Sequence, residues 1–444
     1  MRLADFVIDF LVKKNIKKVF TVSGGGSIFL CDALFKAKKL KYISCHHEQA
    51  VAFAAESYSR LKNKPGAALV TTGPGGTNCL TGVACCWIDS VPTMFISGQV
   101  YLDQTIKKTR LRQIGVQEID IISMVKDFTK YSVLIKQPNE ILYHLEKAYY
   151  ESTNGRPGPV WIDIPADIQN AEIDIKKLKR FNPPKTKKRL NKLDNQIKKI
   201  AKLLAKSKRP VIHIGHGGRI SNCEKNLRKL VDRYKIPFAL TWNASDLVES
   251  SHPSYIGRPG AFAERGSNFI IQNADLYISV GTRLPFMVTG YNSKDFARKA
   301  KIVMIDIDSK ELKNTRVLAN HKLKVDAGYF LDKLVKELPQ KIHLDKNWLD
   351  YCRKVRKKYP IVLDQYKKQK NSINSYYFID ILSELLKPRD VVVTDMGLSF
   401  VGTHQAFKVK KGQRVFTNSG HAPMGWGLPA AIGAYYASIE SKGK

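Results

Sequence analysis

The chain has 444 residues, of which 43% are hydrophobic and 10% aromatic, a composition typical of a globular protein with two or three domains. Its net charge of +35 suggests nucleic-acid binding as one possible function. The lysines, however, are spread along the chain, gather mainly at 176–210 and 353–369, and accompany no RNA- or DNA-binding motif. Nucleic-acid binding is therefore disfavoured as the main function. The seven cysteines are odd in number and show no C-x-x-C spacing, which argues against a disulfide framework and a zinc site and favours a reduced, cytoplasmic protein.

The first twenty residues, MRLADFVIDFLVKKNIKKVF, predict an amphipathic helix that leads into a strand. Asp5 and Asp9 interrupt its apolar residues, so the segment does not have the pattern of a signal peptide. No later apolar run is long enough to cross a bilayer. We therefore expect no membrane partner.

From residue 17 to about 170, short apolar runs alternate with helical stretches, and several runs lead directly into a turn that contains glycine. This rhythm predicts βαβ units and a parallel sheet covered by helices on both faces. The expected strands are 17–23, 41–45, 66–72, 93–99 and 158–166. The double proline and dense charge of 174–192 then indicate a linker between domains.

A second α/β pattern runs from about 193 to 340, followed by a charged helical segment at 341–370. Its expected strands are 209–215, 236–242, 274–281 and 300–308. A third unit then begins, with helices at 376–386 and 425–438 and strands at 390–397 and 413–419. It stops at Lys444, after roughly half the length of a typical domain, so we expect a C-terminally truncated version of a longer protein.

The predicted fold is therefore α/β, with three open parallel-sheet domains at 1–172, 193–340 and 371–444, the third incomplete. Four long blocks, in order along these domains, resemble the thiamine diphosphate enzymes of the acetolactate synthase type. They are HHEQAVAFAAESYSR (46–60), TTGPGGTNCLTGVACCWIDSVPTMFISGQV (71–100), GRPGPVWIDIPADIQ (155–169) and GHAPMGWGLPAAIGA (420–434). One glycine loop would be weak evidence, whereas four blocks in order, three in the first domain and one in the third, are strong.

The resemblance implies a role for each domain. The first would bind the aminopyrimidine of thiamine diphosphate, and the third would bind its diphosphate through Mg²⁺. The central domain would be Rossmann-like and holds FAD in some members of the family. The first and third domains act across a subunit interface in this family, which implies a homodimer or tetramer.

Glu48 lies where an apolar strand meets a helix of small residues. By resemblance it is the catalytic glutamate. In this family a buried carboxylate forms a hydrogen bond with N1′ of the pyrimidine, and the cofactor's own 4′-imino group then activates the thiazolium carbon. The alanines at 50, 52, 54 and 55 would let a ring approach closely. The structural alternative is a glutamate in the first turn that stabilises the helix dipole. His46 and His47 either line the site or are satisfied structural groups.

Two further positions are candidates for the substrate pocket. Gly25 belongs to a GGG turn after the first strand that is not a G-x-G-x-x-G loop, and by resemblance it lies near the pyrimidine. Gln117 matches a family glutamine near the substrate, but Val116 replaces the usual preceding phenylalanine, which leaves the acceptor open. The loop 73–78 also looks like a phosphate cradle, although in the family it shapes the face of the site and no phosphate is assigned to it.

The segment APMGWG (422–427) is the second informative motif. By resemblance, the Met424 side chain would prop the cofactor into its bent shape, while the carbonyl of Ala422 and the N–H of Met424 would bind the pyrimidine edge. The alternative for Met424 is a core-filling side chain. Gly397 and Ser399 are the expected diphosphate contacts, although the glutamine and histidine that follow this glycine in the family are absent.

Two departures from the family pattern bear on the cofactors. The magnesium motif is missing, so its ligands are expected beyond Lys444 and none on this chain. In the central domain, GTRLPFMVTG (281–290) keeps Arg283 but has Pro-Phe-Met where the family carries an acidic pair and a second arginine. FAD therefore stays open, with Arg156 and Arg283 as its candidate contacts.

The resemblance implies decarboxylation of a 2-oxo acid such as pyruvate and transfer of the remaining fragment to a carbonyl acceptor, as in branched-chain amino acid biosynthesis. One alternative is a paralogue that uses the same chemistry on another substrate, for instance in building a surface sugar. The other is a catalytically inactive homologue, which the missing metal motif permits.

Overall fold

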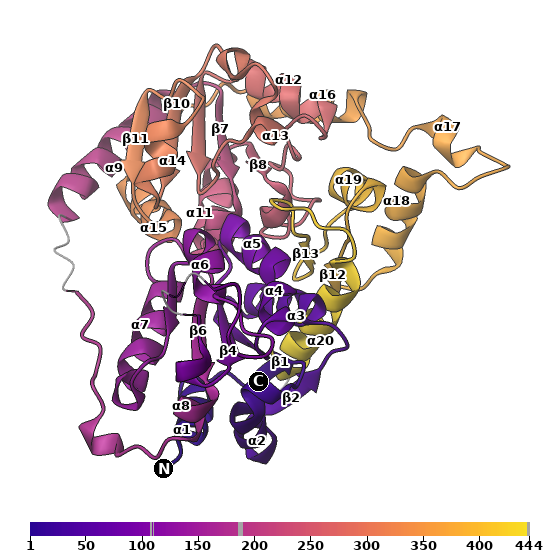
Figure 1. Cartoon of the computed structure of the whole chain (residues 1–444). Helices are drawn as coiled ribbons and strands as arrows, with labels where there is room; N and C mark the ends of the chain where they lie inside the picture. The colour runs from indigo at the N-terminus through magenta and orange to yellow at the C-terminus, as the bar shows by residue number, and fades with distance from the viewer. Residues whose placement is uncertain (107–108, 110, 185–189, 442–444) are drawn as a thin grey trace. The chain divides into compact units, whose positions relative to one another are not determined.

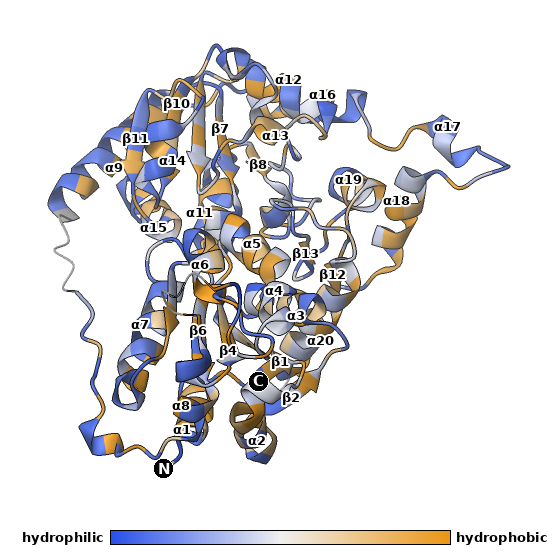
Figure 2. Cartoon of the chain, in the orientation of Figure 1, coloured by the Kyte–Doolittle hydropathy of each residue, from blue (hydrophilic) through white to orange (hydrophobic). Residues whose placement is uncertain are grey.

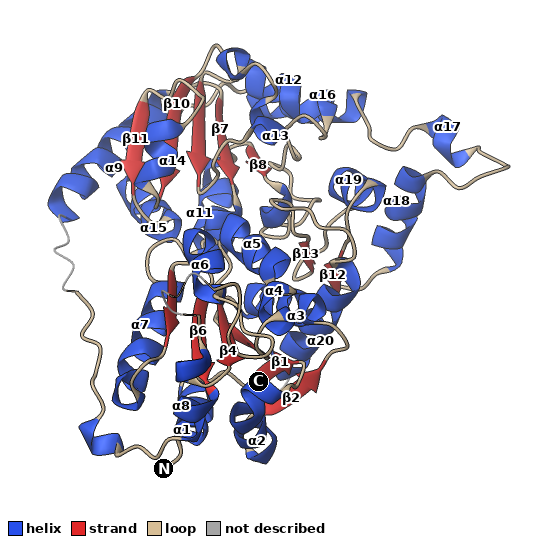
Figure 3. Cartoon of the chain, viewed as in Figure 1, coloured by secondary structure: helices blue, strands red, loops and turns tan. Residues whose placement is uncertain are grey.

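The chain divides into two compact units, each built on a parallel sheet (Figure 1). Unit 1 comprises residues 1–186 and 418–444, and unit 2 comprises residues 187–417. In both units helices cover the sheet (Figure 3), which confirms the α/β class. The residues that the computed structural model describes are 1–106, 109, 111–184 and 190–441.

The sheet of unit 1 has the strand order β2-β1-β3-β4-β6-β5, with every neighbouring pair parallel. Its strands are β1 (Lys18–Thr21), β2 (Lys41–Ser44), β3 (Gly66–Val70), β4 (Thr93–Gln99), β5 (Tyr131–Leu134) and β6 (Val160–Pro165). The five strands expected in this region are confirmed. The sixth, β5, was not anticipated, because all four of its residues are only half-buried at the sheet edge.

Alternating strand residues of unit 1 feed two apolar layers, as a parallel sheet buried on both faces requires. Met94 and Ile96 face one layer, while Phe95 faces the other, where it stacks on Trp161 at 5.3 Å between ring centroids. The helices of the first layer are α1 (Leu3–Lys13), α2 (Ile28–Lys36), α7 (Ile141–Thr153) and α8 (Ala166–Asn170). Those of the second are α3 (Glu48–Lys62), α5 (Leu80–Asp89), α6 (Ile121–Val125) and α20 (Gly427–Ser441).

The main sheet of unit 2 has the order β11-β10-β9-β7-β8 and is parallel throughout. Its strands are β7 (Pro210–Ile214), β8 (Phe238–Leu240), β9 (Leu276–Val280), β10 (Lys301–Asp306) and β11 (His321–Lys324). The four expected strands are confirmed. The strand β11 was missed because Leu323 alone is buried in its sequence HKLK.

Helices again cover both faces of the main sheet in unit 2. One layer is formed by α9 (Leu190–Lys206), α11 (Glu224–Tyr234) and α15 (Ala327–Glu337), the other by α12 (Arg265–Asn273) and α16 (Trp348–Lys358). In α9, Ile197, Ile200 and Leu204 are buried, whereas its lysines stay exposed and give the helix its hydrophilic colour in Figure 2. Shorter helices are α10 (His216–Ile220), α13 (Phe286–Thr289), α14 (Ser309–Asn314) and α17 (Asp364–Lys367).

The residues of the expected third domain are divided between the two compact units. In unit 2, β12 (Val391–Val393) and β13 (Arg414–Phe416) form a two-stranded parallel sheet next to α18 (Ser375–Leu385) and α19 (Leu398–Ala406). In unit 1, α20 packs along α3 and buries Ala430, Ala434 and Ala437.

The cysteines, the apolar segments and the predicted linker can each be compared with the structure. All seven cysteines lie in the described part of the chain, and their thiols are free. No helix among the described residues has both the length and the apolar character needed to span a bilayer. Of the expected linker at 174–192, residues 185–189 lie outside the described residues.

Candidate active site at the carboxyl edge of the first sheet

Helix α3 begins immediately after β2, and His47 fixes its start. His47 has extended backbone angles and its Nδ1 accepts a hydrogen bond from the backbone N–H of Gln49 at 3.1 Å, which is the geometry of a helix N-cap. Glu48 is therefore the first residue of the helix. His47 thus has a structural hydrogen bond, and both His46 and His47 are exposed.

The Glu48 side chain is half-buried, and only one of its two carboxylate oxygens has a hydrogen-bond partner among the described residues. The side-chain amide of Asn78 donates to its Oε2 at 2.9 Å, and the Cys79 thiol donates to the Glu48 backbone carbonyl at 3.4 Å. Its second oxygen, Oε1, makes no hydrogen bond with any other residue that the structure describes. The Oε1 atom of a carboxylate oriented in this way can accept a hydrogen bond from a bound molecule. Sequence reasoning missed Asn78, whose only signal was its place at the end of the GPGGTN loop.

Three of the small residues after Glu48 belong to the packed interior of unit 1. Ala52, Ala54 and Ala55 are fully buried within the second layer of unit 1. A Cβ on Gly82 of α5 would come within 2.2 Å of the Ala52 side chain, and one on Gly433 of α20 within 2.0 Å of the Ala54 carbonyl. Ala52 and Ala54 thus lie where neighbouring helices approach α3, whereas Ala50 is half-buried and its expected closeness to a ring stays a prediction.

The loops that follow β1 and β3 are packed against each other. The backbone N–H of Gly26 donates to the Thr71 hydroxyl at 3.1 Å, and a Cβ on Gly24 would come within 2.6 Å of the same side chain. Gly25 between them is exposed and its missing side chain faces open space. The GGG turn is thus fixed by contacts of Gly24 and Gly26 with Thr71, and only Gly25 faces open space.

The loop that follows β4 brings Gln117 against the β3 loop. A Cβ on Gly73 would lie 2.0 Å from the Gln117 carbonyl, and Gly73 has a φ of +57°, so two constraints favour glycine there. Gln117 itself has a φ of +66°, an uncommon conformation for a residue with a side chain. Buried Glu118 supports the loop by accepting from the backbone N–H of Ile106 at 2.6 Å.

A buried polar network lies beneath these loops at the ends of β4 and β6. The side chain of Gln99 donates to Asp163 at 3.1 Å and to the Ile119 carbonyl at 3.0 Å, and it also bonds Thr72. Ser97 donates to Asp163 at 2.6 Å. Burial raises the pKa of the Asp163 carboxyl to about 7, although the hydrogen bonds from Ser97 and Gln99 act in the opposite direction.

The turn before α20 carries the second predicted pair, Ala422 and Met424. Ala422 has a left-handed φ of +58°, and the side chain of Met424 is 87% exposed. Met424 therefore does not fill a core in this chain. Both residues belong to unit 1, as does Glu48.

The remaining candidates are distributed over both units. Gly397 caps α19 in unit 2 with a φ of +74°, and the Ser399 hydroxyl in the same helix donates to the Met396 carbonyl at 2.8 Å. Arg283 is exposed in unit 2. Arg156 belongs to unit 1, where its Nε donates to the Ser90 hydroxyl at 2.8 Å.

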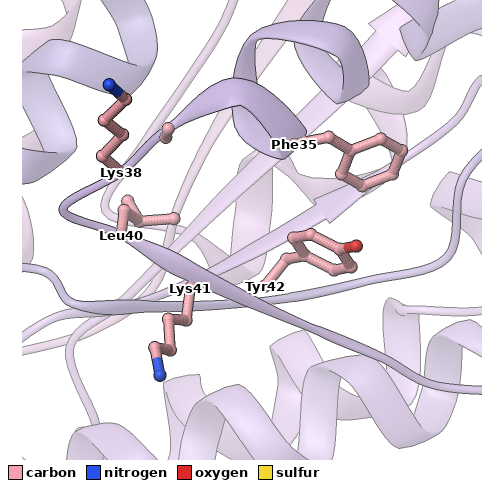
Figure 4. A pocket seen from close by; sticks show the side chains of 6 residues that line it. Phe35, Lys38, Leu40, Lys41 and Tyr42 are labelled. Carbon is pink, nitrogen blue, oxygen red and sulfur yellow. The ribbon is translucent and has the colours of Figure 1, made fainter.

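No cluster of metal-ligating side chains marks the site within the described residues. These residues contain no group of three or more His, Cys, Asp or Glu side chains that could hold a metal ion. A surface hollow of about 310 Å³ lies beside the edge strand β2 (Figure 4), where the rings of Phe35 and Tyr42 are 4.5 Å apart. None of the candidate residues lines it.

Three family models of thiamine pyrophosphate enzymes match the chain. The N-terminal TPP binding domain matches residues 1–124, the central domain 197–334 and the C-terminal TPP binding domain 395–442.

Curated relatives match almost the whole chain. It is 34% identical to a probable acetolactate synthase large subunit of Methanocaldococcus jannaschii, over 98% of this chain and 74% of that protein. It is 32% identical to an acetolactate synthase large subunit of Cyanidium caldarium (97% and 74%). It is 29% identical to the large subunit of an Escherichia coli acetolactate synthase isozyme (99% and 75%). The chain thus spans about three-quarters of the length of these relatives.

Proposed function

The chain belongs to the thiamine diphosphate-dependent enzymes of the acetolactate synthase type, and on this basis we propose that it decarboxylates a 2-oxo acid such as pyruvate and joins the remaining fragment to a carbonyl acceptor. The observation that carries the proposal is the Glu48 carboxylate, which Asn78 holds through one oxygen while the other accepts no hydrogen bond from any described residue. This arrangement supports the role of Glu48 as the acceptor for the pyrimidine ring.

Three features of the chain support a catalytic role for the Glu48 carboxylate. Asn78 fixes the orientation of Glu48 through a 2.9 Å hydrogen bond. The N-terminus of α3 favours the negative charge of its first residue, because its backbone N–H groups point toward it. Partial burial strengthens a hydrogen bond to the ring relative to the same bond in water. Thiamine diphosphate, when bound, supplies the carbon nucleophile and the electron sink that decarboxylation requires.

The other candidate residues take binding roles in this proposal. The carbonyl of Ala422 and the N–H of Met424 hold the pyrimidine edge, and the exposed Met424 side chain supports the ring system. Gly25 and Gln117 line the substrate pocket, and the packing of Gln117 against the β3 loop supports its place there. Gly397 and Ser399 contact the diphosphate.

Other assignments stay predictions. Mg²⁺, which would anchor the diphosphate, is one of them, and no step is assigned to it. FAD binding, with Arg156 and Arg283 as contacts, is a separate prediction that the visible absorption spectrum of the purified chain tests. The names of the relatives, which are large subunits, support an oligomeric enzyme, and we propose a homo-oligomer with the active site across the subunit interface.

The experiment that tests the proposal compares the native chain with Glu48→Gln. We expect pyruvate-dependent product formation to fall about 100-fold or more in the variant, which is the size of effect that loss of an acid–base group produces. We expect thiamine diphosphate to bind both proteins, since the substitution removes the charge that activates the ring and leaves the diphosphate contacts in place. Calorimetric titration with thiamine diphosphate and Mg²⁺ measures the binding.

The matched control is Glu224→Gln, because Glu224 is likewise the first residue of a helix, α11. Both substitutions remove a favourable helix-dipole interaction, but the control variant should keep its turnover. Equal losses in the two variants would contradict a catalytic role for Glu48. Product analysis with pyruvate alone and then with 2-oxobutyrate identifies the acceptor and tests the paralogue alternative.

A further inference from the structure

The turn that carries Ala422 and Met424 is anchored at both ends by one buried carboxylate, that of Glu56 in α3. At the first end, the side-chain amide of Asn418 donates to Glu56 Oε1 at 3.4 Å. At the second end, the indole N–H of Trp426 donates to Glu56 Oε2 at 3.0 Å. The side chains of all three residues are fully buried. The nine residues 418–426 thus begin and end on the two oxygens of a single side chain.

Between these anchors the backbone is unusual. Asn418 also accepts a hydrogen bond from the backbone N–H of His421 at 3.2 Å, which tightens the first half of the turn. Ala422 has a φ of +58° and Gly425 a φ of +78°. A residue with a side chain is strained in this region. Such a conformation persists where the surrounding contacts hold it, and the two anchors on Glu56 are such contacts.

The charge of Glu56 is matched from within its own unit. Arg60, one turn further along α3, donates its Nε to Glu56 Oε1 at 3.0 Å and its Nη2 to Asp89 of α5 at 2.9 Å. Burial raises the pKa of Glu56, and the Arg60 guanidinium and the Trp426 N–H act in the opposite direction. A buried carboxylate needs such partners, because an unpaired one is costly in an apolar interior.

From these contacts we propose that Glu56 is a positioning residue, which clamps the turn 418–426 so that Ala422 and Met424 are presented to the cofactor. The inference rests on the proposed function for the role of the cofactor, whereas the clamp itself concerns only this chain. It adds to the site a residue that touches neither substrate nor cofactor. Its mechanical consequence is a turn that is ordered before any ligand binds, which lowers the entropic cost of binding.

The test removes one donor while keeping the aromatic packing. Trp426→Phe deletes the indole N–H, and Glu56→Gln removes the charge that receives it. We expect hydrogen exchange of the backbone amides at 419–425 to accelerate about tenfold in the chain without cofactor, which corresponds to about 1.4 kcal/mol. We expect the dissociation constant for thiamine diphosphate to rise in the same proportion, while kcat at saturating cofactor changes less than twofold.

The matched control is Tyr58→Phe, which removes a hydrogen bond from Tyr58 of α3 to Glu440 in the last turn of α20, at 2.9 Å. This variant should leave exchange at 419–425 unchanged. Unchanged exchange in Trp426→Phe would overturn the clamp, and faster exchange with unchanged cofactor affinity would overturn its positioning role. If the native chain binds no cofactor, the proposed function fails, and the exchange measurement still decides whether Glu56 holds the turn.

Discussion

Asp163 is a buried carboxyl whose protonation should alter the stability of unit 1. It is 1% exposed, and burial raises its pKa from 3.8 to about 7, with Asp120 and Glu118 acting in the same direction. Between pH 3.8 and about 7, Asp163 is mostly protonated in the folded state and mostly ionised in the unfolded state. The stability that this group contributes is therefore fully present below about pH 3.8 and is lost as the pH rises through 7.

We predict that Asp163→Asn removes this dependence, because the amide stays neutral at every pH. From pH 5.0 to 7.5 the free energy of unfolding of the native chain should fall by about 2 kcal/mol relative to that of the variant. Urea titrations at the two pH values measure the difference. A constant difference between the two proteins would mean that Asp163 does not change its protonation in this range.

At the scale of elements, α3 is held by two helices that approach it through glycine. Gly82 of α5 and Gly433 of α20 both lie where a Cβ would overlap α3. Close backbone approach of this kind allows extensive van der Waals contact, and it brings the turn before α20 within reach of Glu56. The position of Ala422 and Met424 in unit 1 thus depends on helix packing as well as on the clamp.

We predict that Gly433→Ala lowers the thermal unfolding temperature, although alanine is intrinsically favoured over glycine in a helix by about 1 kcal/mol. The new Cβ would come within 2.0 Å of the Ala54 backbone carbonyl, which cannot move without displacing α3. The matched control is Gly402→Ala in α19, where a Cβ would be 4.0 Å from its nearest neighbour, Ile379. That substitution should raise the unfolding temperature, and a rise in both variants would contradict the close packing of α20 on α3.

At the scale of the whole molecule, the excess of 74 basic over 39 acidic residues means that like charges repel one another in the folded state. We predict that the unfolding temperature rises when NaCl is increased from about 0.01 M to about 0.15 M, because the Debye length falls from about 30 Å to about 8 Å. The rise should be larger at pH 5.5 than at pH 8, since the ten histidines add positive charge. An equal rise at both pH values would point to a salt effect other than charge screening.

Several features of the fold follow from local sequence. Strands such as β4 and β6 are short, apolar and rich in β-branched or aromatic residues, and helix α1 has a regular apolar stripe, so their positions were predictable from periodicity. The same holds for the family, because four motif blocks occur in order. Weakly apolar edge strands such as β5 and β11 were not predictable, because their residues are mostly exposed or half-buried and gain their structure from a neighbouring strand.

The sequence by itself determined the fold class, the family and the identity of Glu48 as the residue to examine. Only the tertiary structure decided what surrounds it: Asn78 as its partner, the alanines of α3 as packing surface, and Glu56 as the anchor of the turn. The physical reason is distance along the chain. Asn78 and Glu48 are 30 residues apart, and Trp426 and Glu56 are 370 apart, so no local pattern records their contact. Such pairs meet because parallel strands place their ends at one edge and because α20 packs on α3.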